Sequence, residues 1–305
     1  MPLHPIVQTI WDRVRSTGFN GYSTFPVEAA REHFSQASKA FGPGPEMHEV
    51  RTVDIPVGGG TVQARLYLPV AQPVGLCVYL HGGGWTLGRL DDFDTLVRTL
   101  AARSGAGFLS VDYRLAPEHP FPIPLDDAIA SIRWAAANLR QLGAGNRLAV
   151  AGDSAGANLA TVAALALRGE ADIRLQILFN PAVDTDGTRP SFAKYGTDYL
   201  LKAADIDWFM AHYAADADPT DPRLAPLRTK DLTGAPPAWI GVAEFDVLTD
   251  EAVTYAEALQ AAGTPTTLRR VDGVMHGFAR QHGIVDVADR AVSEAAEALR
   301  AAFAR

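Results

Sequence analysis

A strand-turn-helix pattern near the middle of the chain constrains the fold most. Residues 146–151 form a short, mostly apolar run, residues 152–156 read Gly-Asp-Ser-Ala-Gly, and an Ala-rich apolar stretch follows. The short run predicts a buried strand and the Ala-rich stretch predicts a buried helix. The two glycines permit strained backbone angles and close packing of helix against strand. Ser154 is therefore predicted on a sharp turn at the edge of a sheet, at the positive end of a helix.

Ser154 has two interpretations at this point. A G-x-S-x-G run between a strand and a helix is typical of a serine that attacks a carbonyl carbon. The alternative is an ordinary glycine-rich turn in which the serine caps the helix. The neighbouring Asp153 is expected to form hydrogen bonds within the turn. Partner residues elsewhere in the chain must distinguish a catalytic serine from a structural one.

A glycine-rich loop at residues 81–85, His-Gly-Gly-Gly-Trp, follows another apolar run. Consecutive glycines let backbone N–H groups converge on one point, as an oxyanion hole requires. We expect the N–H groups of Gly83, Gly84 and Ala155 to form such a hole, with His81 holding the loop by hydrogen bonding. A phosphate-binding loop is the alternative, but the run matches neither G-x-G-x-x-G nor G-x-x-x-x-G-K-[ST].

A serine nucleophile needs a histidine base and an acid that orients the base. Three histidines follow Ser154, namely His212, His276 and His282. His276 lies in a predicted turn at residues 272–278, after a strand-like stretch, which suits a catalytic imidazole. His212 lies in a predicted amphipathic helix, where a surface role is expected, and His282 is the second candidate for the base.

The acid is sought after the predicted strand 238–243, because a serine on a G-x-S-x-G turn is typically followed along the chain by the acid and then by the histidine. Asp246 lies in the loop after this strand and is the first candidate, with Glu244 as the second. Asp250 and Glu251 fall in the first turn of the next predicted helix, where the helix dipole favours negative side chains. These two are interpreted as helix-end residues.

Five motifs occur in order along the chain: residues 81–85, 112–122, 152–160, 244–251 and 275–278. On these motifs and their spacing, the chain resembles the hormone-sensitive-lipase-like (family IV) carboxylesterases of the α/β-hydrolase superfamily. The matching residues cover most of the chain.

The resemblance implies a serine carboxylesterase that hydrolyses short- to medium-chain acyl esters through an acyl-enzyme. It implies a catalytic triad and an oxyanion hole at the positions already considered: Ser154, His276 and Asp246 for the triad, and Gly83, Gly84 and Ala155 for the hole. The small-molecule ester is the expected partner. A monomer, or a homodimer joined through the last strand and helix, is the expected assembly.

Two other kinds of function stay open. An amidase, a deacetylase or a lactonase would use the same triad on a different acyl group. A non-catalytic receptor for a small ligand is a further alternative, because some plant hormone receptors resemble this family. Such receptors have lost the triad histidine, whereas His276 is present here.

Apolar runs and helix-like segments alternate along most of the chain, which predicts an α/β fold with a mostly parallel sheet of about eight strands and helices on both faces. A glycine-rich link at 57–60 predicts that the first two strands form an antiparallel hairpin. The resemblance makes this the α/β-hydrolase fold. The predicted strands are 49–56, 61–68, 75–80, 107–111, 147–151, 174–179, 238–243 and 266–271, and the predicted helices are 92–103, 124–139, 154–168, 203–213, 249–262 and 286–303.

Two stretches interrupt the alternation, residues 1–46 and 184–231. They divide the core into a first part, residues 47–183, and a second part, residues 232–305. The resemblance suggests that both stretches pack together as a helical cap over the active site, where they would bury apolar groups against the acyl chain. The alternative is that they decorate the surface of the core.

Composition excludes several classes of partner. A formal charge of −8 over 305 residues argues against nucleic acid or an anionic membrane surface. No signal peptide and no run of about 18 apolar residues is present, which predicts a cytoplasmic protein without stable membrane insertion. The single cysteine, Cys77, excludes an internal disulfide and is expected to be buried. No cysteine and histidine cluster has zinc spacing, so neither a metal nor a cofactor is expected.

Overall fold

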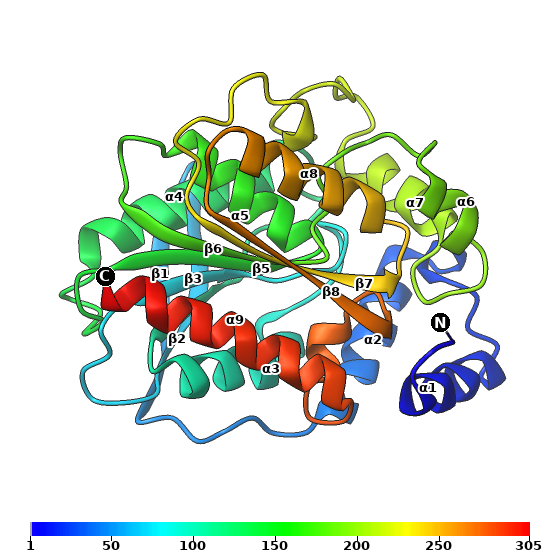
Figure 1. Ribbon diagram of the computed structural model, residues 1–305, viewed down its shortest axis with the longest axis horizontal. Helices are drawn as coiled ribbons and strands as arrows, with labels where there is room; N and C mark the ends of the chain where they lie inside the picture. The colour runs from blue at the N-terminus through cyan, green and yellow to red at the C-terminus, as the bar shows by residue number, and fades with distance from the viewer. Residues whose placement is uncertain (1) are drawn as a thin grey trace.

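An eight-stranded sheet forms the centre of the molecule, as Figure 1 shows. The computed structural model describes residues 2–305. The strand order is β1-β2-β4-β3-β5-β6-β7-β8, with antiparallel pairing of β1 with β2 and of β2 with β4, and parallel pairing elsewhere. The strands are β1 (Glu49–Val57), β2 (Gly60–Leu68), β3 (Leu76–Leu80), β4 (Gly107–Val111), β5 (Leu148–Asp153), β6 (Ile173–Phe179), β7 (Ala238–Phe245) and β8 (Thr266–Met275). The predicted mostly parallel sheet and its antiparallel opening hairpin are confirmed.

Helices cover both faces of this sheet (Figure 1). Three of them, α4, α5 and α8, pack on one face, and α3 and α9 pack together on the other. The core helices are α3 (Leu90–Ser104), α4 (Ile123–Asn138), α5 (Ala155–Ala166), α8 (Thr249–Ala261) and α9 (Asp286–Ala304). Each lies within a few residues of the predicted range, because apolar periodicity marks the face that the sheet buries.

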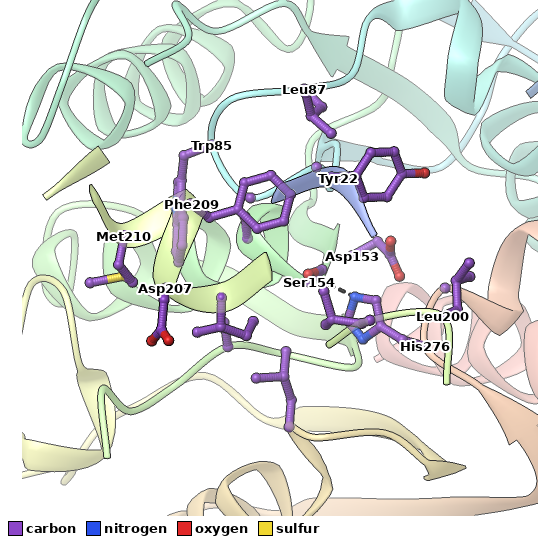
Figure 2. A pocket seen from close by; sticks show the side chains of 18 of the residues that line it. Tyr22, Trp85, Leu87, Asp153, Ser154, Leu200, Asp207, Phe209, Met210 and His276 are labelled. Carbon is purple, nitrogen blue, oxygen red and sulfur yellow. Dashed lines mark hydrogen bonds between the residues drawn. The ribbon is translucent and has the colours of Figure 1, made fainter. Parts of the chain in front are cut away.

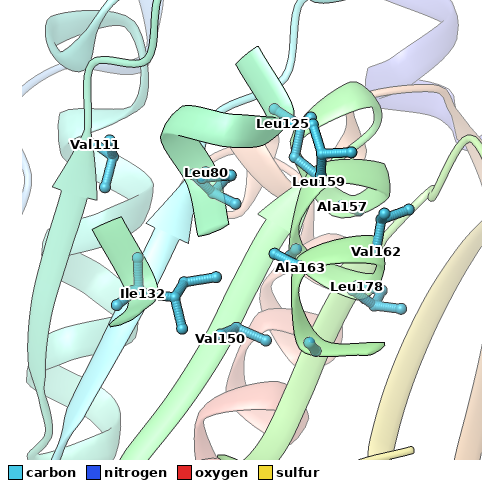
Figure 3. Close-up of a cluster of buried hydrophobic side chains, with 14 of the residues drawn as sticks. Leu80, Val111, Leu125, Ile132, Val150, Ala157, Leu159, Val162, Ala163 and Leu178 are labelled. Carbon is cyan, nitrogen blue, oxygen red and sulfur yellow. The ribbon is translucent and has the colours of Figure 1, made fainter. Parts of the chain in front are cut away.

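The helix after Ser154 is enclosed almost completely. Every residue of α5 from Ala155 to Leu165 is buried, and Figure 3 shows Leu159 and Val162 among side chains of the neighbouring strands and α4. Small alanine side chains let this helix approach the sheet closely, since interiors are packed to near-crystalline density. Cys77 is buried in β3, as predicted.

The last strand is longer than predicted. The sequence suggested a strand at 266–271 followed by a turn, but β8 continues to Met275. Gly273 adopts a positive φ of 73° inside the strand, and the register between β7 and β8 shifts between Ala243 and Phe245. The glycine that signalled a turn instead accommodates an irregularity in the ladder. His276 therefore follows directly after the strand.

Two segments contribute no strand to the sheet: the N-terminal segment, residues 2–46, and the inserted segment, residues 184–231. The first contains α1 (Pro5–Ser16), η1 (Tyr22–Thr24), α2 (Val27–Ser38) and η2 (Lys39–Phe41), and the second contains α6 (Pro190–Tyr195), α7 (Ala203–Tyr213) and η3 (Pro226–Arg228). They are joined to each other: the backbone N–H of Ser23 donates to Asp205 at 2.8 Å, and the Trp11 indole N–H donates to the Asp198 carbonyl at 3.1 Å. In the part of the chain that the structure describes, no helix is both long and apolar enough to cross a membrane.

Candidate active site

Ser154 lies at the turn between β5 and α5 with a left-handed backbone, φ 56°. Such a conformation is strained for a residue with a side chain and persists only where the surroundings enforce it. Gly152 and Gly156 make the turn possible, because a Cβ at Gly156 would lie 2.0 Å from the Leu80 carbonyl oxygen and one at Gly152 would lie 2.3 Å from that of Gly156. Small residues are required at both positions, as predicted.

The hydroxyl of Ser154 does not cap α5, although Ser154 occupies the N-cap position. Its Oγ lies instead 3.0 Å from Nε2 of His276, the contact drawn as a dashed line in Figure 2. The Nδ1 of His276 lies 2.6 Å from Oδ2 of Asp246. The structure thus joins Ser154, His276 and Asp246, which come from the ends of three different strands, in one hydrogen-bonded chain.

Asp246 is fixed by two further donors. The side-chain amide of Asn180 donates to the same Oδ2 that contacts His276, and the backbone N–H of Leu248 donates to Oδ1 at 3.1 Å. Asp246 is only 2% exposed. A buried carboxylate needs such partners, because desolvation without them is costly. Asn180 was missed by the sequence interpretation, although its position just after β6 places it at the same sheet edge.

Burial and neighbouring charges shift the pKa values of His276 and Asp153. Burial alone would lower the pKa of His276, but the charge of Asp246 and the hydrogen bond to it outweigh burial and raise this pKa above its ordinary value. Burial raises the pKa of Asp153 to about 6, although the charge of His276 acts in the opposite direction. Both carboxylates therefore favour a protonated imidazole.

Asp153 corrects one expectation. Hydrogen bonds within the turn were predicted for its side chain, but among residues 2–305 its Oδ1 has no hydrogen-bond partner. Its carboxylate lies against Gly82, where an added Cβ would be 2.7 Å from Oδ2. The N–H of Ser154, a donor in the same turn, is already used by the Phe179 carbonyl at 2.8 Å.

The glycine-rich loop lies between β3 and α3. Gly83 and Gly84 have φ values of 122° and 59°, and their backbone N–H groups donate to no acceptor within the described chain. The loop is held by the N–H of Leu87, which donates to the Gly83 carbonyl at 2.8 Å. His81 lies 2.9 Å from the Gly82 carbonyl through Nδ1 and stacks on the Tyr113 ring, in line with its predicted structural role.

The other two histidines after Ser154 and the second candidate for the acid have other partners. His282 is buried and lies 2.8 Å from the Thr99 hydroxyl, and the His212 ring packs edge-on against Trp208 in α7. Glu244 accepts the backbone N–H of Gly273 at 2.8 Å, at the irregularity in β8. The structure does not bring these side chains into the hydrogen-bonded chain at Ser154.

Glu251 lies at a helix end, as predicted, but also makes contacts that the sequence did not indicate. It does lie in the first turn of α8, but it is fully buried and accepts the backbone N–H groups of Val183 and Asp184 at 2.7 and 3.2 Å. Burial raises the pKa of Glu251 to about 8. It therefore fastens the start of the inserted segment to the core. Asp250 accepts the N–H of Ser191 in the same segment at 2.8 Å.

A cavity of about 300 Å³ opens above Ser154. Its wall is drawn from the core, the N-terminal segment and the inserted segment, and Figure 2 shows Trp85, Phe209 and Met210 on one side of Ser154, with Tyr22 and Leu200 on the other. Most of the wall is apolar, with Asp153, Arg280 and Gln281 among the polar exceptions. Such a cavity suits a small, largely apolar ligand. No group of three or more His, Cys, Asp or Glu side chains among residues 2–305 is arranged to hold a metal ion.

Comparison with known proteins decides the family. A model of the alpha/beta hydrolase fold matches residues 77–280. The chain belongs to the α/β-hydrolase family. The carboxylic ester hydrolase LipN of Mycobacterium tuberculosis is 40% identical to it, with 99% of this chain and 84% of LipN covered. An ethyl acetate hydrolase of Pseudomonas putida is 40% identical, with 79% of each chain covered.

Solved structures agree with this assignment. A hyperthermophilic esterase from Pyrobaculum calidifontis superimposes on this α/β-hydrolase with a TM-score of 0.94 at 37% identity, over 99% of both chains. The predicted fold and the resemblance to hormone-sensitive-lipase-like carboxylesterases are confirmed. At the level of enzyme class, the prediction of a carboxylic ester hydrolase is confirmed as well.

Proposed function

We propose that this α/β-hydrolase is a serine carboxylesterase in which Ser154 is the nucleophile, His276 the general base and Asp246 the residue that orients the base. The observation that carries the proposal is the unbroken chain of contacts from Ser154 Oγ to His276 Nε2 at 3.0 Å and from His276 Nδ1 to Asp246 at 2.6 Å. A histidine whose Nδ1–H donates to a carboxylate presents an unprotonated Nε2 to the serine.

Acylation is the first half of the reaction. Ser154 Oγ attacks the ester carbonyl carbon while His276 Nε2 takes the hydroxyl proton. The carbonyl oxygen becomes an oxyanion, which the N–H groups of Gly83, Gly84 and Ala155 are proposed to stabilise, each contributing roughly 3 kcal/mol. His276 then returns the proton to the alcohol oxygen as the C–O bond breaks. The acyl group stays on Ser154 as an ester.

Deacylation reverses the same steps with water. His276 removes a proton from a water molecule, the resulting hydroxide attacks the acyl carbon, and the proton returns to Ser154 Oγ as the acid leaves. The buried donors to Asp246, from Asn180 and Leu248, support this cycle because they keep the carboxylate fixed while His276 gains and loses its proton. One ester and one water give one acid and one alcohol.

Short acyl esters fit the cavity best. Its volume of about 300 Å³ lies at the small end of the roughly 300–1,000 Å³ range of ligand pockets, and its wall is mostly apolar. The relative named ethyl acetate hydrolase also supports a small ester. We further propose that the N-terminal and inserted segments act as the cap of this enzyme, because Tyr22 of one and Phe209 of the other line the cavity and their rings lie 6.4 Å apart.

The test is hydrolysis of p-nitrophenyl acetate and butyrate by the wild type and by Ser154→Ala. The variant is expected to lose at least about a thousandfold in kcat. A serine-directed phosphonate should add once, and peptide mapping should find it on Ser154. Wild-type rates for Ser154→Ala, or labelling at another residue, would contradict the proposal. Matched ester, anilide and lactone substrates distinguish an esterase from an amidase or a lactonase.

A further inference from the structure

Arg280 places a positive charge in the wall of the cavity above Ser154. It lies in η4 (Phe278–Gln281), one short 3₁₀ turn after His276, and lines the same cavity as Ser154 and Asp153. Arg280 takes no part in the ester hydrolysis proposed above. A charged side chain in a largely apolar wall therefore calls for its own explanation.

Aromatic rings surround this guanidinium. Its central carbon lies 4.5 Å from the centroid of the Phe34 ring and 4.8 Å from the centroids of the Phe41 and Phe93 rings. Phe34 and Phe41 belong to the N-terminal segment, and Phe93 belongs to α3. Such faces attract the cation and remove its water, but they do not neutralise its charge. Phe34, Phe41 and Phe93 therefore hold the guanidinium in place without neutralising its positive charge.

No carboxylate pairs with Arg280. Among the described residues, no Asp or Glu oxygen lies within 4.0 Å of its nitrogens, and its only hydrogen bond runs from Nη2 to the Ser38 hydroxyl. Nη1 has no acceptor among residues 2–305, and the side chain remains partly exposed to the cavity. Asp153 and Asp92 act on its charge from longer range. A dehydrated guanidinium with a free donor is suited to bind an anion, above all a carboxylate.

The two ends of the cavity differ in exposure. Asp153 is 4% exposed, whereas Asp207, which lies on the far side of Ser154 in Figure 2 near Met210, is exposed. In ester hydrolysis the alcohol must leave before water attacks the acyl-enzyme. The exposed end therefore suits the alcohol, and the end with Asp153 suits the acyl group.

We propose that Arg280 is a specificity-determining residue that binds a carboxylate at the far end of the acyl group, so that hemiesters of short dicarboxylic acids are preferred substrates. This inference rests on the proposed esterase function of Ser154. The substrate carboxylate supplies the acceptor that Nη1 lacks. It also raises the pKa of the neighbouring Asp153 further and so favours the neutral form of that acid, which limits repulsion between the two.

The test compares two esters of similar shape. Monoethyl succinate carries the carboxylate, and ethyl 4-methylpentanoate carries an uncharged isopropyl group of similar shape in its place. Hydrolysis of each ester is followed by pH-stat titration, and the quantity compared is the ratio of the two kcat/KM values. This ratio is measured for the wild type and for Arg280→Met, a variant that keeps an unbranched side chain but carries no charge. We expect the ratio to favour succinate in the wild type and to fall roughly tenfold or more in the variant, as loss of a hydrogen bond to a charged group predicts.

Arg290→Met is the matched control, because Arg290 is exposed on α9 and, within the described part of the chain, pairs with Asp286 alone. Its ratio should equal that of the wild type. Free succinate should inhibit the wild type competitively and inhibit Arg280→Met at least roughly tenfold more weakly. Equal losses on both esters in Arg280→Met, with the ratio unchanged, would show a purely structural arginine and overturn the inference. A wild type that hydrolyses p-nitrophenyl acetate but shows no preference for monoethyl succinate would also overturn the inference, whereas a wild type that hydrolyses none of the three esters would overturn the esterase proposal instead.

Discussion

Asn180 donates its side-chain amide to Asp246, at the same carboxylate oxygen that contacts His276. Asn180 has a φ of 45°, a left-handed conformation that asparagine tolerates better than most residues. The strained backbone aims the amide at the carboxylate from the end of β6. An asparagine at this position thus satisfies a conformational and a hydrogen-bonding requirement together.

Asn180→Gly separates these two requirements. Glycine accepts the positive φ without strain but removes the amide, so Asp246 loses one of its two fixed donors. We expect kcat/KM on p-nitrophenyl butyrate to fall roughly 10- to 100-fold through misplacement of the base, with folding retained. Circular dichroism confirms folding. Full activity in the glycine variant would exclude a role for the amide in positioning Asp246.

The pH dependence of activity should reveal the charge of Asp153. The neutral imidazole is the active form, so the rate falls as the pH drops through the raised pKa of His276. Asp153 contributes to that raised pKa, and Asp153→Asn removes its negative charge. The acid limb of the kcat/KM profile should therefore move to lower pH. Asp207 also places a carboxyl group in the wall of this cavity, so Asp207→Asn is the control and should leave the midpoint of the acid limb unchanged. Equal midpoints in the wild type and both variants would contradict the prediction.

Gly84→Ala should damage the loop above Ser154. An added Cβ would lie 2.2 Å from the Phe209 ring of α7, in addition to the strain of φ 59°. We expect at least about a tenfold loss of kcat/KM, because the N–H of Gly84 and the inserted segment would both shift. Gly105→Ala is the control for strain, since Gly105 ends α3 in the left-handed conformation, with φ 73° and ψ 8°, and nothing lies within 4 Å of an added Cβ. That variant should lose only about 1 kcal/mol of stability, and similar esterase rates for both variants would count against a role for the clash.

Glu251 should make the stability of the enzyme depend on pH. Its folded pKa of about 8 lies above the ordinary value of 4.5, so the folded state holds this proton more tightly than the unfolded chain does. Its contribution to the free energy of unfolding is therefore greatest at pH 4.5 and below, and is lost as the pH rises toward 8, by at most about 1.4 kcal/mol per pH unit.

Glu251→Gln stays neutral throughout and keeps an oxygen that can accept the N–H groups of Val183 and Asp184. Urea unfolding at pH 5, 6.5 and 8 should show the wild type losing stability relative to this variant as the pH rises. Glu297→Gln, on the exposed face of α9, is the control. Parallel stability curves for the wild type and Glu251→Gln would mean that Glu251 is ionised in the folded protein.

Local sequence patterns carried most of the fold. The alternation of apolar runs with helical segments reflects burial of one face of each helix and both faces of each central strand. Burial therefore selects the residue type at each position, and the pattern can be recognised in the sequence. The turn around Ser154 could also be predicted from the sequence, because only glycine fits at positions 152 and 156. The glycine at 273 misled the prediction for the same local reason: positive φ is compatible with a turn and with an irregular strand alike.

The sequence by itself determined the fold, the family and the candidates Ser154, His276 and Asp246, since these follow from residue type, order and local backbone requirements. Only the tertiary structure decided that the Ser154 hydroxyl lies at His276 instead of capping its helix. It also decided that, among residues 2–305, no donor reaches Oδ1 of Asp153 and no carboxylate pairs with Arg280, which stands among aromatic rings. Charge, pKa and hydrogen bonding depend on which groups approach from distant parts of the chain and how much water they exclude. No local pattern records that distance or that burial.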